Sequence, residues 1–178
     1  DPPTEAAAYS WENLSDGERI TLDESHLRII GNVIELYAND HKGHFPPDLV
    51  TADQDFEGVR SDIYVSPRTD SAIPRGTMSP LERSAWVATR ADYIYLGAGQ
   101  SNTASPNTIL AYDNPDRVAG DIDVLYGDGH VGSLDRADAA VLIGFADVPP
   151  NDPPPSPPTT PAPDPKVVQR ASNLSAIS

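Results

Sequence analysis

The stretch VLYGDGHVGSLD, residues 124–135, contains a carboxylate and an imidazole close together, because His130 follows Asp128 by two positions. Such a pair could bind a metal ion or transfer a proton. However, Asp128-Gly129 also separates two runs in which apolar residues alternate with small or polar ones. Asp-Gly in this setting is typical of a β-hairpin with a type I′ turn, in which both central residues have positive φ. The pattern therefore favours a structural turn at Asp128 and Gly129 over a catalytic site.

Four carboxylates lie close together in the segment DNPDRVAGDID, residues 113–123: Asp113, Asp116, Asp121 and Asp123. Carboxylate oxygens at short spacing are the ligands that calcium prefers. The EF-hand pattern is absent, because its glycine and its terminal glutamate are missing. A solvated acidic loop is therefore the favoured interpretation and a calcium site the weaker one. No other cofactor is expected.

The histidines and the known catalytic motifs give no further candidate site. His41 and His44 could share a metal ion, but no third ligand is evident, and a solvated helix end is the better interpretation. His26 is expected at the surface of the first helical turn. The sequence contains no nucleophile elbow, Walker loop, dinucleotide fingerprint or His-Glu-x-x-His motif. We therefore expect a protein that is not an enzyme.

Composition limits the partners and the location of the protein. The 178 residues suit one domain with tails, and their net charge of −15 disfavours binding to nucleic acids or anionic membranes. There is no cysteine, and no run approaches the roughly 20 apolar residues of a membrane-spanning helix. Because the sequence begins at Asp1, we expect a processed product, exported to the cell surface or beyond.

One long helix is the clearest element that the sequence predicts. The Thr-x-x-Glu spacing of TLDE predicts its start at Thr21, with Asp23 as a rival N-cap. Gly43 and the following proline pair predict its end. Apolar residues recur between these limits at helical spacing, which predicts one broad buried face made of Leu27, Ile29, Ile30, Val33, Ile34, Leu36 and Tyr37.

The remainder of the domain alternates strand-like runs with turn residues. Runs rich in β-branched and aromatic residues predict strands at 62–66, 92–98, 108–113, 123–127 and 130–134. Residues 81–90 are expected to form a short helix or an irregular crossing, and residues 136–145 a last short helix. The predicted fold is α+β, with the long helix packed on an antiparallel sheet within a domain at residues 21–148.

Both ends of the chain are predicted to be extended arms. Residues 1–20 are polar without a sustained period, and residues 149–178 begin with a proline-rich run that favours polyproline II. The run could be a disordered linker or could be held by a neighbouring subunit. Candidate glycosylation sites of an exported protein are Asn13 and Asn173, in Asn-x-Ser sequons, and Ser156, Thr159 and Thr160, among prolines.

The order of these pieces resembles a known family. The segment LRIIGNVIELYANDHKGHFPPDL (27–49) is similar to the helix-to-loop junction of bacterial type II secretion pseudopilin-like (prepilin-type) proteins. The later runs DYIYLGAG, TILAYDNP and VLYGDGHVGSL match, in order, the group named for a histidine that nine intervening residues separate from an Asp-Gly pair. The chain has Val118 at that histidine position, Ser66-Pro67 where the family has Cys-Pro, and a polar segment where members have an apolar stem.

The resemblance implies a pilin-like fold and a role in an assembly. The leading hypothesis is a non-enzymatic structural subunit of an extracellular fibre or surface filament, in which extended terminal arms contact neighbouring copies of the same chain. A pseudopilin of a type II secretion-like machine is the second hypothesis. A carbohydrate- or calcium-binding surface module is the third.

Overall fold

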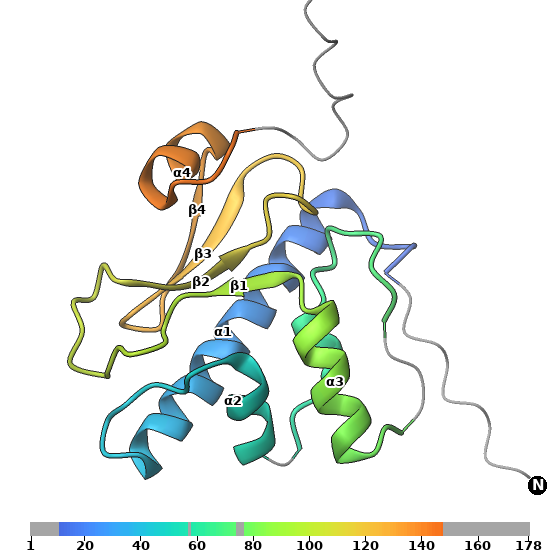
Figure 1. Cartoon of the computed structure of the whole chain (residues 1–178). Coiled ribbons are helices and arrows are strands. Elements are labelled where there is room, and N and C mark those ends of the chain that lie inside the picture. The colour runs from blue at the N-terminus through green and yellow to red at the C-terminus, as the bar shows by residue number, and fades with distance from the viewer. Residues whose placement is uncertain (1–10, 57, 74–76, 148–178) are drawn as a thin grey trace, which may run out of the picture.

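The fold is α+β, as the sequence predicts. The structure, a computed structural model, describes residues 11–56, 58–73 and 77–147. A long helix, α1 (Asp16–Asp40), lies across one face of a four-stranded antiparallel sheet with the order β1-β2-β3-β4 (Figure 1). The predicted C-terminal arm from residue 149 onward, with Asn173, Ser156, Thr159 and Thr160, lies outside the described residues, as do the first ten residues.

Helix α1 begins one and a half turns earlier than predicted. Ser15 is its N-cap, and a capping box joins Ser15 and Glu18: the Ser15 hydroxyl accepts from the Glu18 amide, and the Glu18 carboxylate accepts from the Ser15 amide. The predicted start at Thr21 is therefore wrong, and residues 16–20 are helical rather than part of an extended arm. Thr21 instead donates its hydroxyl to the carbonyl of Gly17, one turn earlier.

The buried face of α1 is narrower than predicted. Leu27, Ile30 and Ile34 are fully buried, which confirms the core stripe, and Val33 joins them. Tyr37 is only half-buried, and Ile29 and Leu36 are 36% and 41% exposed, so they do not extend the face as expected. The helix also approaches the sheet closely at Gly31, where an added Cβ would lie 3.0 Å from the Leu125 side chain.

The sheet contains four of the five predicted strands. They are β1 (Tyr93–Tyr95), β2 (Ile109–Asp113), β3 (Ile122–Tyr126) and β4 (Val131–Leu134), each antiparallel to the next. The predicted strand at 62–66 is wrong, because Ser61–Tyr64 forms a 3₁₀ helix, η1. Ile63 and Tyr64 are buried in this short turn beneath α1, so their apolar character reflects core packing rather than strand pairing.

Three short helices complete the fold. The sequence did not reveal α2 (Leu49–Asp55), whose N-cap Asp48 accepts from the Thr51 amide at 2.7 Å. Helix α3 (Pro80–Arg90) has a capping box from Ser79, and α4 (Arg136–Ile143) ends at Gly144, where φ is +91°. Helix α4 packs on the face of the sheet opposite α1, against Tyr112, Ile122 and Val124 (Figure 1).

The Asp128-Gly129 turn joins β3 to β4 as predicted, but its type differs. The Gly129 amide donates to the Tyr126 carbonyl, the Tyr126 amide donates to the His130 carbonyl, and Gly129 has φ of +84°. Lys42 is the one non-glycine residue of the described chain with positive φ, so Asp128 lacks the backbone that type I′ demands. The loop is a three-residue connection in which Gly129 alone takes the left-handed conformation.

Candidate functional site: a buried carboxylate cluster

Three aspartates from three different elements meet inside the domain. Asp23 of α1, Asp113 at the end of β2 and Asp123 of β3 are each fully buried, and one carboxylate oxygen from each lies within 4.8 Å of the other two. Asp113 and Asp123 face α1 because they alternate with Tyr112 and Val124, which face α4. The Asp123 amide donates to Asp113 Oδ2 at 2.9 Å, which joins the two strands at this point.

Arg68, in the loop after η1, supplies the positive charge of this cluster. Its Nη1 lies 3.0 Å from Asp113 Oδ2, 3.4 Å from Asp123 Oδ2 and 3.8 Å from Asp23 Oδ2. The Arg68 side chain is only 10% exposed, so these contacts are shielded from bulk water. Charges interact more strongly in such a place than they do in water. One guanidinium thus faces three carboxylates.

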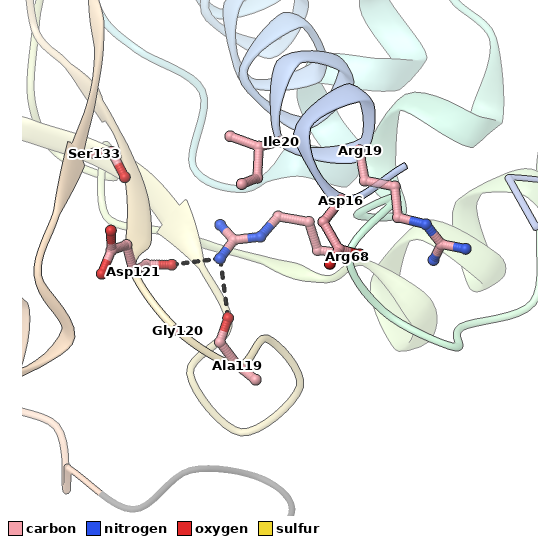
Figure 2. Close-up of a pocket in the computed structure, with 8 residues that line it drawn as sticks. All are labelled: Asp16, Arg19, Ile20, Arg68, Ala119, Gly120, Asp121 and Ser133. Atoms are coloured by element: carbon pink, nitrogen blue, oxygen red, sulfur yellow. Dashed lines mark hydrogen bonds between the residues drawn. The ribbon is translucent and has the colours of Figure 1, made fainter. Parts of the chain in front are cut away.

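The other end of the guanidinium is fixed by backbone carbonyls. Arg68 Nη2 donates to the carbonyls of Ala119 (3.0 Å) and Asp121 (2.7 Å), as Figure 2 shows. This side opens into a cleft of about 590 Å³ between the start of α1 and the loop before β3. The lining residues are Asp16, Arg19, Ile20, Arg68, Ala119, Gly120, Asp121 and Ser133 (Figure 2).

The hydrogen-bonding capacity of the cluster is incompletely used. Among the described residues, Asp23 Oδ2, Asp113 Oδ1 and Asp123 Oδ1 are buried without a hydrogen-bond partner. Burial raises the pKa of Asp113 well above its usual range, with a further increase from the Asp23 charge that Arg68 only partly opposes. Burial likewise raises the pKa of Asp123 to about 6. The cluster therefore has the chemistry of a site that takes up protons or a cation.

A tyrosine from the edge strand orients the helix carboxylate. The Tyr93 hydroxyl donates to Asp23 Oδ1 at 2.7 Å, and both residues are buried. Burial and the neighbouring Asp23 charge raise the Tyr93 pKa well above its usual value, so the phenol stays protonated and remains a donor. This contact fixes which Asp23 oxygen, Oδ2, turns toward Arg68.

The structure places only two of the four weak calcium candidates in this cluster, and the favoured interpretation of a solvated acidic loop is wrong for these two, which are buried. Asp113 and Asp123 lie in it, whereas Asp116 and Asp121 are exposed, and Asp121 reaches Arg68 only through its backbone carbonyl. The sequence did not indicate Asp23 or Arg68 as site residues, and Asp23, the rival N-cap, lies inside α1 rather than at its start. The sequence did contain one sign that Asp23 is buried. Asp23 lies four residues before Leu27, so both side chains are on the apolar face of α1 that packs into the core.

The histidines and the hairpin carboxylate lie elsewhere. Asp128 and His130 are both exposed, and their side chains contact each other at the tip of the hairpin. The prediction of a surface position for His26 is wrong: it is buried, its Nδ1 lies 3.0 Å from the Val65 carbonyl, and burial lowers its pKa. His41 donates from Nδ1 to the Tyr37 carbonyl at 2.8 Å, a helix-end contact.

The remaining predicted positions are simple to place. Asn13 is exposed just before α1, and the hydroxyl of Ser15 in its sequon serves as the N-cap of that helix.

In the described residues, no helix combines the length and the apolar character needed to cross a membrane. Comparison of the chain with protein-family models, curated proteins and solved structures finds no match.

Proposed function

We propose that the chain is a non-enzymatic structural subunit of an extracellular fibre or surface filament, assembled from copies of itself. The observation that carries the proposal is the outer edge of β4. In the described residues, no strand pairs with that edge, because β4 is the last strand of the sheet. A sheet edge presents backbone donors and acceptors that an extended segment of another molecule can pair with.

The backbone pattern of β4 identifies which groups are available to such a segment. The Tyr126 amide donates to the His130 carbonyl, so the alternation of an antiparallel ladder gives Gly132 and Leu134 the bonds to β3. The amides of Val131 and Ser133 consequently point away from the sheet. Helix α4 follows β4 directly in the chain and exposes two further apolar side chains, Val141 (88%) and Leu142 (61%).

The sequence of the C-terminal segment, residues 149–178, supplies an occupant. The run at residues 149–165 is rich in prolines, which lack amide donors, but residues 166–178 (KVVQRASNLSAIS) contain no proline and carry two β-branched residues, Val167 and Val168, directly after Lys166. At about 3.1 Å per residue, seventeen extended residues span roughly 50 Å, which is enough to reach a neighbouring domain. The resemblance to pilin-like proteins, together with the long helix packed on an antiparallel sheet, also supports a subunit of a filament.

Two matched pairs of variants test this proposal by negative-stain electron microscopy and light scattering. Deleting residues 166–178 should give a folded domain without filaments, whereas replacing the proline run by a Gly-Ser run of equal length should weaken assembly less. Ser133→Pro removes an outward amide and no backbone bond to β3, so it should abolish filaments. Ser133→Ala keeps that amide and should leave assembly intact. Filaments of normal length from the truncated chain or from Ser133→Pro would refute this mode of assembly and favour the pseudopilin hypothesis.

A further inference from the structure

The carboxylate cluster under Arg68 is a candidate ion site that does not depend on the proposed filament. When all three carboxylates are ionised, they and the one guanidinium leave two negative charges in a buried place. Uncompensated buried charge is costly, and a protein removes it by protonation or by binding a cation. The excess of two charges equals the charge of one divalent ion.

The unpartnered oxygens are the second observation that points to a ligand. Asp23 Oδ2, Asp113 Oδ1 and Asp123 Oδ1 are buried and accept no hydrogen bond among the described residues. Buried polar atoms in native proteins are normally satisfied by protein, water or an ion. Tyr93 already fixes Asp23 Oδ1, so the free Oδ2 is the oxygen that turns into the cluster.

The spacing of the oxygens fits calcium. Calcium binds oxygen at about 2.3–2.6 Å, so two ligand oxygens on one ion lie at most about 4.6–5.2 Å apart. The three aspartates offer one oxygen each within 4.8 Å of the others. Magnesium demands about 2.0–2.1 Å and near-ideal octahedral geometry, and it retains most of its waters, which suits a dry cluster poorly.

We propose that Asp23, Asp113 and Asp123 form a calcium site in which the ion neutralises the two charges that Arg68 leaves uncompensated. Arg68 belongs both to this cluster and to the wall of the cleft, where its Nη2 donates to the Ala119 and Asp121 carbonyls. If the Arg68 side chain moved aside, the cleft would open onto the three carboxylates, and an ion could reach them. Asp16 and Asp121 at the cleft favour the approach of a cation, whereas Arg19 opposes it.

Protons compete with calcium for the same oxygens, and this competition makes the site testable. The charged and titratable groups around it are Asp23 and Glu24 of α1, Arg68 and Asp92 of the adjoining loops, Tyr93 of β1, Asp113 of β2 and Asp123 of β3. Calcium must displace the protons that the aspartates hold at low pH. Its effect should therefore be larger at pH 8 than at pH 5.

The first experiment measures thermal unfolding of the full chain with calcium chloride or magnesium chloride. At a calcium concentration about tenfold above Kd, the melting temperature at pH 8 should rise by about 3–6 °C, and magnesium should have a smaller effect. Asp113→Asn should remove the calcium response. Asp116→Asn, which removes an exposed carboxylate from the same loop, should retain it. No calcium response in the wild type at pH 8, or an equal response in Asp113→Asn, would overturn the site.

A second experiment locates the ion and does not depend on the stability of one variant. Terbium, which takes calcium sites, emits when a nearby excited tyrosine transfers energy to it, and Tyr93 contacts the ligand Asp23 directly. Excitation of the wild type should give terbium emission that calcium displaces. Tyr93→Phe should reduce that emission several-fold, and Asp123→Asn should abolish the binding. Emission that is undiminished in Tyr93→Phe would place the ion elsewhere and refute the assignment.

Discussion

Two buried carboxylate sites lie a short distance apart on the same sheet, and they are satisfied to very different degrees. Asp92, just before β1, is fully buried and accepts four hydrogen bonds. Its donors are the Ser66 amide (3.1 Å), the Thr69 hydroxyl (2.8 Å), the Ser71 hydroxyl (2.9 Å) and Arg117 Nη1 (2.6 Å). The cluster of Asp23, Asp113 and Asp123 has a single arginine for three charges.

The difference separates a structural role from a binding role. Asp92 has both carboxylate oxygens bonded, and it ties the loop at residues 66–71 to the sheet, so it has no capacity left for a ligand. The cluster leaves three oxygens without a hydrogen bond and concentrates charge where water is excluded. Burial alone is therefore no sign of a binding site, whereas burial with unused acceptors is.

The largest effect is expected from removing the satisfied carboxylate. Asp92→Ala leaves a serine, a threonine, a backbone amide and Arg117 without their shared acceptor inside the protein, so it should cost about 3–5 kcal/mol of unfolding free energy. Chemical denaturation at pH 7 measures this loss of unfolding free energy. Asp70→Ala, at an exposed aspartate of the same loop, is the control and should have little effect. A small loss in Asp92→Ala would show that the network is not a structural anchor.

The cluster of Asp23, Asp113 and Asp123 should make the domain less stable as the pH rises. A carboxyl whose folded pKa is raised stabilises the fold fully below its unfolded pKa of about 3.9, and this contribution is lost as the pH rises through the folded value. For Asp123 that window runs from about pH 4 to about pH 6, and Asp113 extends it upward. Each raised pKa unit corresponds to about 1.4 kcal/mol. Without calcium, the domain should therefore unfold more readily at pH 8 than at pH 5.

Asp113→Asn is the variant that isolates this effect. The amide oxygen can still accept from Arg68 and from the Asp123 amide, as Asp113 Oδ2 does. Its NH₂ group can donate to a neighbouring carboxylate, in the way that a protonated Asp113 would. The variant should match the wild type at pH 5 and exceed its stability at pH 8 in chelator-treated buffer. Lower stability than the wild type at pH 8 would contradict the excess of negative charge.

A smaller effect is expected from the arginine of the satisfied site. The Arg117 side chain is 38% exposed, so water can replace part of its contact with Asp92, and three other donors remain. Arg117→Ala should therefore cost about 1 kcal/mol, as for a partly exposed ion pair. Denaturation of this variant beside Asp92→Ala separates the charge of the pair from the acceptor itself. Equal losses in both variants would show that the ion pair dominates the site.

The sequence predicted the elements of the fold better than it predicted the site. The helical period of Leu27, Ile30 and Ile34 and the β-rich runs near Tyr93 and Val124 identify elements because each pattern is local. The strand predicted at residues 62–66 was wrong because a short apolar run has no period that separates a strand from a buried turn. Helix α2 was missed because its seven residues are fixed by Asp48 and by packing on α3.

The site depends on distances that no local pattern contains. Arg68 is 45 residues from Asp113 and 55 from Asp123, and only the packing of α1 on the sheet brings Asp23 to both. Asp113 and Asp123 were grouped as calcium candidates, in the weaker of the two interpretations, because they belong to one segment. Asp116 and Asp121 were grouped with them for the same reason, although they lie outside the sheet and are exposed.

The smallest effect on stability is expected from the exposed contact between Asp128 and His130 at the tip of the hairpin. Asp128 accepts from the His130 amide at 3.1 Å and contacts the His130 imidazole, and its pKa is lowered by these two contacts, backbone first. Both residues are exposed, so water competes for every bond that they make.

His130→Ala retains the backbone amide and the αL glycine that build the turn, so the melting temperature and the filaments should be unchanged. Gly129→Val is the matched variant, because a β-branched residue resists the φ of +84° at that position, and it should lower the melting temperature measurably. If His130→Ala instead abolished assembly or a measurable activity, the hairpin tip would be a functional surface rather than a turn. The free oxygens under Arg68 would then have a rival as the binding site of this domain.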